Sequence, residues 1–338
     1  MKENGRVVVT GTVYNLLLNL LIIPEEEIAS TLFFTCDSIP YSVRSNLKKE
    51  IFIPDMHNIG KMRTFKYLME YRVLDFIFCP RLNHSRIYAQ DHLPFMSLIV
   101  GERKYAFTED GPNVFKVNEK FRYVQDAWEL HEHSSSATWL SRIINPLQGG
   151  IYARNDFCDE LVVSEATCGN IPDYALEKKV TVVKMKEIWD KSSDEKKQQI
   201  LKVFDITSED INLMKSRHIV VFTQPFFEDG DVPSLEEQIN VYREVLSGYN
   251  LNDVIIKTHP REKTDYKKFF PEVVVFNKPV PFQLLDLIGL NIIEAATVCS
   301  TAALSLPNPV KINWVGAKIH PGILKEYGDF IPEQLNSK

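Results

Sequence analysis

Short apolar runs rich in β-branched and aromatic residues alternate with helix-length segments over nearly the whole chain. In the first half these runs occupy residues 6–10, 30–36, 74–80, 104–111, 159–165 and 180–185. Runs this apolar are typical of strands that are buried on both faces. Helix-like stretches such as 59–71 lie between them, so the pattern predicts repeated βα units around a parallel sheet.

The first apolar stretch has to be distinguished from a secretory signal, because basic residues precede it. Small and polar residues interrupt it between positions 10 and 19, and no Ala-x-Ala cleavage site follows. We expect a strand over 6–10 that turns at Gly11 into a helix over about 12–23. No window reaches the roughly 18 uninterrupted apolar residues that a membrane-spanning helix needs.

A polar, lysine-rich stretch with helical period, residues 186–217, separates these strands from a second set. We place a domain boundary there, which predicts an N-terminal α/β domain over 1–186 and a C-terminal α/β domain over 187–338. The expected fold class is α/β, with two Rossmann-like domains that face each other across a cleft.

The second half carries the clearest element boundaries. A strand over 218–226 precedes a helix that begins at a capping box formed by Ser234 and Glu237, and the next strand is 253–259. Such a right-handed βαβ unit places His259 at the carboxyl edge of a parallel sheet, where ligands bind. The remaining expected elements are a helix over about 281–290, a strand over 292–298, a short segment over 301–306 and a strand over 311–316.

Composition limits the classes of protein. The 338 residues suit two domains, and 44% apolar with 25% charged residues describes an ordinary soluble protein. A formal charge of −6 argues against a nucleic-acid partner. Five widely spaced cysteines indicate buried thiols in a reducing compartment. We expect a cytoplasmic protein without an integral membrane segment, which would contact a membrane only peripherally, through a membrane-linked substrate.

Common cofactor and metal motifs are missing from the sequence. It has no Gly-x-Gly-x-x-Gly after a strand, no Walker phosphate loop and no His-Glu-x-x-His. His131 and His133 lack a third ligand nearby, and Asp229 with Asp231 forms an Asp-x-Asp that is also a typical turn sequence. We therefore predict no metal site and no cofactor.

Two short motifs each occur twice. Glu-Asp-Gly stands at Glu109-Asp110-Gly111 and again at 228–230. Asp110 directly follows a predicted strand, and Gly111 tolerates φ > 0, so this carboxylate is well placed for a general base. The second copy is expected to form a turn.

His-Pro stands at His259-Pro260 and again at 320–321. His259 ends a strand, in a loop that Lys257, Arg261 and Lys263 are expected to make electropositive and suited to a phosphate. Ser300 and Thr301, at a predicted helix start, add hydroxyl and backbone N–H donors for the same anion. We interpret the copy at 320–321 as a turn.

The ordered motifs resemble those of a known family. Glu109-Asp110-Gly111, His259-Pro260, Pro281-Phe282-Gln283-Leu284-Leu285 and Ser300-Thr301 are similar to the motif series of bacterial sialyltransferases. The similarity is greatest to the group that contains lipooligosaccharide and streptococcal-type capsule sialyltransferases, and it spans about residues 105–305.

The resemblance implies a GT-B glycosyltransferase with the acceptor sugar on its first domain and CMP-sialic acid, the donor substrate, on its second. It implies an inverting, metal-independent transfer of sialic acid to a galactose-type terminal sugar of a bacterial surface glycan. Asp110 would deprotonate the acceptor hydroxyl and His259 would donate to the leaving phosphate. The further donor-binding positions would be Pro260, Gln283, Ser300 and Thr301.

The sequence departs from the family pattern at two positions. Gln283 stands where the family tends to have an acidic residue for the cytosine amino group, and glutamine accepts that hydrogen bond more weakly. Thr301 replaces a serine and keeps the hydroxyl. Two alternatives stay open: a nucleotide-sugar 2-epimerase, and a non-catalytic carbohydrate-binding protein on a transferase scaffold.

Overall fold

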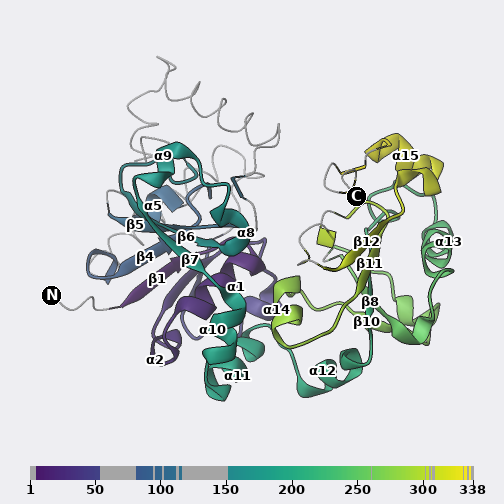
Figure 1. Ribbon diagram of the computed structural model, residues 1–338, viewed down its shortest axis with the longest axis horizontal. Helices are drawn as coiled ribbons and strands as arrows, with labels where there is room; N and C mark the ends of the chain where they lie inside the picture. The colour runs from purple at the N-terminus through teal and green to yellow at the C-terminus, as the bar shows by residue number, and fades with distance from the viewer. Residues whose placement is uncertain are drawn as a thin grey trace, which may run out of the picture. The chain divides into compact units, whose positions relative to one another are not determined.

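The computed structural model describes residues 5–53, 81–93, 96–100, 103–111, 114–115, 151–259, 261–300, 302–303, 306, 309–329, 331–332 and 335. The chain divides into two compact units, Met1–Phe204 and Asp205–Lys338. Each unit is built around its own parallel β-sheet, and Figure 1 shows helices packed along both sheets. The predicted α/β fold class is confirmed. The strand predicted over 74–80 and the helix over 59–71 lie outside the described residues.

The sheet of unit 1 has the order β3-β2-β1-β4-β5-β6-β7 within the described part of the chain, and all its pairings are parallel. Its strands are β1 Arg6–Val9, β2 Leu32–Thr35, β3 Glu50–Phe52, β4 Arg86–Ala89, β5 Tyr105–Thr108, β6 Cys158–Ser164 and β7 Lys179–Val183. The strongly apolar runs predicted β1, β2, β5, β6 and β7. The pattern did not reveal β3, which has only three residues, or β4, whose apolar positions are interrupted by an arginine and a tyrosine.

The helices of unit 1 are α1 Val13–Ile22, α2 Glu25–Ile28, α3 Tyr41–Arg44, α5 Met96–Val100, α8 Glu165–Cys168, α9 Asp173–Leu176, α10 Met185–Lys191 and α11 Asp194–Val203. The predicted strand and helix at the start of the chain are confirmed as β1 and α1. Thr12 caps α1, because its side chain accepts the N–H of Asn15. The leucines of α1 and the valines of β1 are fully buried, as the core of a doubly covered sheet requires.

The predicted domain boundary after residue 186 differs from the observed division at Phe204. The lysine-rich stretch is helical, as expected, but α10 and α11 pack against α1 of unit 1. Lys196 of α11 is buried, and its Nζ donates to the carbonyl oxygen of Leu21 at 2.6 Å. Tertiary packing therefore keeps this polar stretch in the first unit.

The sheet of unit 2 has the parallel order β10-β9-β8-β11-β12. Its strands are β8 Ile219–Phe222, β9 Val254–Lys257, β10 Val274–Phe276, β11 Glu294–Thr297 and β12 Lys311–Trp314, and its α-helices are α12 Ser208–Lys215, α13 Leu235–Leu246, α14 Phe282–Leu287 and α15 Pro321–Tyr327. The predicted unit of strand, crossover helix and strand is confirmed as β8-α13-β9. Figure 1 shows α13 and α14 on opposite sides of this sheet.

The N-terminus of α13 differs in one detail from the predicted capping box. Ser234 accepts the N–H of Glu237 as expected. The Glu237 carboxylate instead contacts Nε2 of His320 at 2.7 Å. His320 is the N-cap of α15 and Pro321 its first residue, so the expected turn at 320–321 is in fact the start of a helix.

The described cysteines form no disulfide. Cys36 and Cys158 are buried as expected, but Cys168 is exposed, and Cys79 lies outside the described residues. Within the residues that the structure describes, no helix combines the length and the hydrophobicity that crossing a bilayer requires.

Candidate active site

Asp110 lies just beyond β5, at the carboxyl edge of the unit 1 sheet, with its side chain 30% exposed. Its backbone carbonyl accepts a hydrogen bond from Thr12 Oγ1 at 3.1 Å. Asn15 Nδ2 donates to the preceding carbonyl of Glu109 at 2.7 Å and to Thr108 Oγ1 at 2.9 Å. The start of α1 therefore fixes the backbone that presents the Asp110 carboxylate.

Glu109 points into the protein and is fully buried. Its Oε1 accepts the Tyr14 hydroxyl at 2.5 Å and the N–H of Ser164 at 2.9 Å. Burial raises the pKa of Glu109, and the hydrogen bonds from Ser164, Thr167 and Tyr14 partly offset this rise. Glu109 thus joins β5 to α1 and β6, while Asp110 is the accessible acid of the motif.

Gly111 does not have the positive φ expected of it, and a Cβ at this position would meet no atom within 4 Å. The motif copy at 228–230 does contain a glycine of that kind, because Gly230 has φ +82°. The residue type alone could not distinguish the two glycines, since the conformation of each loop depends on its surroundings.

His92 is a candidate site residue that the sequence pattern did not reveal. Its Nε2 lies 3.3 Å from Oδ2 of Asp110. Its Nδ1 is buried without a hydrogen-bond partner in the described part of the chain. His92 therefore faces the Asp110 carboxylate through Nε2. The polar Gln90-Asp91-His92 run after an apolar segment was the available signal.

The position of His92 depends on a left-handed turn at Tyr152 and Ala153, with φ 56° and 65°. The buried Asp91 carboxylate accepts both of their N–H groups, at 2.7 and 2.6 Å, and the Tyr105 hydroxyl at 3.1 Å. Burial raises the pKa of Asp91, against the opposing effect of these hydrogen bonds. The turn lays the Tyr152 ring on the His92 ring, with centroids 5.2 Å apart and an interplanar angle of 12°.

His259 follows β9 at the carboxyl edge of the unit 2 sheet, as predicted. Its Nδ1 accepts the N–H of Arg261 at 3.2 Å. Burial lowers the pKa of His259, and the charges of Arg261 and Lys257 lower it further while Asp229 opposes them. The neutral ring therefore carries its proton on Nε2, which is left as a hydrogen-bond donor for a ligand.

Two of the three basic residues expected to make the His259 loop electropositive are buried or paired. Lys257 belongs to β9 and is only 8% exposed, with its Nζ 3.3 Å from the carbonyl oxygen of Thr258. Burial lowers its pKa to about 8. Arg261 is paired with both carboxylate oxygens of Asp229, at 2.6 and 2.9 Å. Pairing and burial thus reduce the positive charge that the loop can offer.

Two of the other predicted donor-binding residues, Ser300 and Gln283, lie in the described part of unit 2. Ser300 follows β11, is 5% exposed, and donates its N–H to Thr297 Oγ1 at 2.9 Å. Because only β8 separates β9 from β11, His259 and Ser300 end strands that are roughly 10 Å apart. Gln283 is the second residue of α14, and its side chain makes no hydrogen bond with the described part of the chain. Pro260 and Thr301 lie outside the described residues.

The predicted turn at 228–230 is confirmed, since residues 226–230 form hydrogen-bonded turns. Among the described residues, no group of three or more histidine, cysteine, aspartate or glutamate side chains is arranged to hold a metal ion. His131 and His133 lie outside them.

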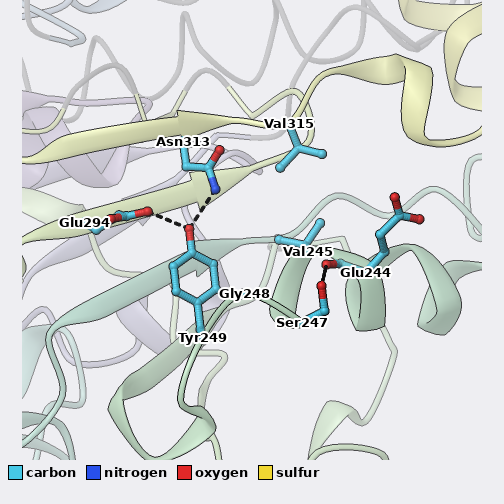
Figure 2. A pocket seen from close by; sticks show the side chains of 8 residues that line it. All are labelled: Glu244, Val245, Ser247, Gly248, Tyr249, Glu294, Asn313 and Val315. Carbon is cyan, nitrogen blue, oxygen red and sulfur yellow. Dashed lines mark hydrogen bonds between the residues drawn. The ribbon is translucent and has the colours of Figure 1, made fainter.

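A cavity of about 420 Å³ in unit 2 lies apart from these residues, between the end of α13 and strands β11 and β12. Tyr249 is one of the residues that line it, and Figure 2 shows its hydroxyl donating to Glu294, at 2.7 Å, and accepting from Asn313, at 2.8 Å. Lys311 also contacts Glu294, at 2.9 Å. These polar groups satisfy one another, so the cavity points to no ligand.

Solved structures with the same fold define the class of protein. The chain is similar to the GT-B domain of a sialyltransferase from Photobacterium damselae, with TM-score 0.56 and 14% identity over 92% of this chain and 89% of that one. It is also similar to an α/β-galactoside α-2,3-sialyltransferase from Photobacterium phosphoreum, with TM-score 0.54 and 10% identity over 96% of both chains. The fold is therefore that of the GT-B glycosyltransferases.

The family follows from the sequence. A model of glycosyltransferase family 52 matches residues 36–321, most of the chain, so the protein belongs to this family. A relative in Haemophilus influenzae, an uncharacterised protein, is 30% identical over 249 residues, which are 74% of each chain. The protein is thus a glycosyltransferase.

Proposed function

We propose that this glycosyltransferase moves sialic acid from CMP-sialic acid to a hydroxyl of a galactose-type terminal sugar on a bacterial surface glycan. The observation that carries the proposal is the hydrogen bonding of the His259 imidazole. Its Nδ1 is occupied by the Arg261 N–H, so Nε2 is a directed donor at a sheet edge where ligands bind. Such a donor suits the phosphate of CMP, a leaving group of low basicity.

In the proposed reaction, the bond between C2 of sialic acid and the phosphate oxygen breaks as the acceptor oxygen bonds to C2. Asp110 takes the proton of the acceptor hydroxyl, and the electron pair of the broken bond leaves on CMP. His259 donates a hydrogen bond to that phosphate. Attack opposite to the leaving group inverts the configuration. His92 holds Oδ2 of Asp110, which leaves Oδ1 for the hydroxyl.

Asp110 is a better candidate base than Asp229 because its carboxylate oxygens are less occupied. Both carboxylate oxygens of Asp229 accept hydrogen bonds from the Arg261 guanidinium, which competes with a substrate hydroxyl for them. Asp110 has no arginine or lysine partner among the described residues and contacts His92 instead.

The donor contacts proposed besides His259 are Pro260, Gln283, Ser300 and Thr301. Gln283 would accept a hydrogen bond from the cytosine amino group, and its amide has no partner in the described chain that would compete. Gln283→Glu should bind CMP more tightly by about 1 kcal/mol, because a charged acceptor is stronger. Calorimetric titration with CMP checks this, and equal affinity in Gln283→Glu, Gln283→Ala and the parent would remove Gln283 from the site.

CMP-sialic acid is proposed to reach the enzyme from the cytoplasm. Any contact with the inner face of the cell membrane would be peripheral, through a membrane-linked acceptor. Transfer is proposed to use no cofactor, because hydroxyls and N–H donors can stabilise the charge on a monophosphate.

One assay separates this function from its alternatives. We expect CMP release from CMP-sialic acid to rise strongly on addition of lactose, with sialyl-lactose detected by mass spectrometry. A nucleotide-sugar 2-epimerase would instead convert a UDP-sugar, and a non-catalytic binding protein would release nothing. The Asp110→Asn variant is the control for contaminating hydrolase activity, since it should lose the lactose-dependent release.

A further inference from the structure

The loop that carries His259 also carries Glu262, whose partly buried carboxylate is the acceptor of several hydrogen bonds. Its Oε2 accepts the backbone N–H of His259 at 3.2 Å and the Thr223 hydroxyl. Its Oε1 accepts Gln238 Nε2 at 3.1 Å and the Tyr266 hydroxyl. Donors from the end of β8, from α13, from the 3-10 helix Tyr266–Lys268 and from the loop itself therefore meet at one side chain.

The partners of Glu262 belong to the core of unit 2. Gln238 is fully buried, and its Oε1 accepts the N–H of Phe227 at 2.7 Å while its Nε2 also donates to Tyr266 at 3.2 Å. Tyr266 is fully buried and meets the Tyr242 ring edge-on, with centroids 5.4 Å apart. Glu262 therefore ties the loop to side chains that packing has already fixed.

The ion pair of this loop is weaker. Arg261 pairs with Asp229 at the surface, where the arginine side chain is 63% exposed. Exposed ion pairs contribute little to stability, because water screens their charges. Lys257 contributes no ion pair to Glu262 within 4.0 Å, although its buried charge lies close enough to interact with it electrostatically.

From this geometry we infer that Glu262 is a positioning residue for His259. By accepting the His259 N–H, it fixes the backbone from which the imidazole projects, and so the direction of Nε2 towards the phosphate. The inference rests on the proposed function for the role of His259 towards the phosphate. It does not rest on that function for the hydrogen bond between the His259 backbone and Glu262. A misplacement of about 1 Å in a catalytic group can lower a rate by about 10²-fold.

The test combines kinetics with NMR titration of the His259 ring in the full-length protein. In Glu262→Ala we expect the His259 pKa to rise towards its ordinary value, because the freed loop becomes solvated. We expect kcat for sialyl transfer to fall by about 10- to 100-fold. Glu262→Gln keeps a carbonyl acceptor for the His259 N–H and should restore most of both properties.

Two further variants keep the test decisive. Glu262→Asp preserves the charge but retracts the carboxylate, so it should shift the His259 pKa and lower kcat even if Glu262→Ala does not fold. Glu294→Ala is the matched control, because Glu294 also accepts a tyrosine hydroxyl in unit 2 but contacts Lys311 rather than the loop. It should lower stability without moving the His259 titration.

Unchanged His259 titration and unchanged kcat in folded Glu262→Ala or Glu262→Asp would overturn the inference. Failure of the parent protein to transfer sialic acid would overturn the proposed function alone, because the NMR titration needs no substrate.

Discussion

At the scale of single residues, the structure separates side chains that hold the site from side chains that can act in it. Glu109 and Asp91 are buried carboxylates whose hydrogen bonds fix the backbone near Asp110. Asp110 and His259 are partly exposed and keep an unfilled hydrogen-bonding position. Burial, rather than residue type, distinguishes the two acids of the Glu-Asp-Gly motif.

Substitution of the two motif aspartates tests the assignment of the base. Asp110→Asn should lower kcat by about 10²- to 10⁴-fold, the usual effect of removing a general base, with little change in CMP affinity. Asp229→Asn should stay within a few-fold of the parent, because it removes only a surface pair with Arg261. Steady-state kinetics and CMP titration of both variants decide this. An inactive Asp229→Asn beside an active Asp110→Asn would transfer the role to Asp229.

The pH dependence of stability should report on Glu262. Burial raises its pKa from about 4.5 to about 7, although its hydrogen-bond donors oppose the rise. Between these values the folded protein keeps a proton that the unfolded chain has lost, so this contribution to stability falls as pH rises from about 4.5 to 7. Urea unfolding from pH 4.5 to 8 should show this slope, and Glu262→Gln should flatten it.

Glu294→Gln is a useful comparison, because the contribution of Glu294 to stability depends on pH in the opposite direction. Burial raises the pKa of Glu294, but hydrogen bonds from Tyr249 and Lys311 outweigh it and lower the pKa overall. Its contribution is therefore present above the unfolded value and lost as pH falls. For the Glu262 prediction, the contradicting outcome is a Glu262→Gln variant whose stability falls with pH above 4.5 as steeply as that of the parent. That result would show that another group titrates in this range.

At the scale of elements, helix α15 is held to α13 through one histidine. His320 Nδ1 accepts the N–H of Gly322 at 3.1 Å, and Nε2 contacts Glu237 at 2.7 Å. Gly322 leaves no room for a side chain, since a Cβ would lie 2.0 Å from the carbonyl oxygen of Asp231. This close approach lets α15 begin directly against the turn that precedes α13.

His320→Ala should destabilise unit 2 by about 0.5–2 kcal/mol, the cost of losing an N-cap, and leave transfer activity within a few-fold. His320→Asn restores a capping acceptor without reaching Glu237, so it should recover part of the loss. Denaturant unfolding with parallel activity assays measures both. A loss of activity in His320→Ala that stability does not explain would make His320, rather than His259, the functional copy of the motif.

At the scale of the whole molecule, the two parallel-sheet units and the family assignment describe a glycosyltransferase. The proposed CMP-sialic acid donor predicts that transfer needs no metal. A monophosphate leaving group can be stabilised by His259, hydroxyls and N–H donors, whereas diphosphate donors more often require a cation. Transfer in EDTA should therefore stay within about twofold of transfer with added magnesium or manganese. Strong loss on chelation that metal restores would contradict this and would direct attention to Asp229 and Asp231.

Sequence alone determined the parallel sheets, because runs such as those of β5 and β8 are apolar enough to require burial on both faces. It also placed Asp110 and His259 at strand ends, since a polar residue after a buried strand lies at the carboxyl edge of the sheet.

Tertiary structure decided what no local pattern encodes. Packing on α1 assigned the lysine-rich α11 to unit 1, and a buried carboxylate, Asp91, set the left-handed turn that brings Tyr152 onto His92. Contacts between residues distant in the chain depend on three-dimensional packing, so the polar run at 90–92 did not by itself show that His92 contacts Asp110, and no local pattern marked Glu262.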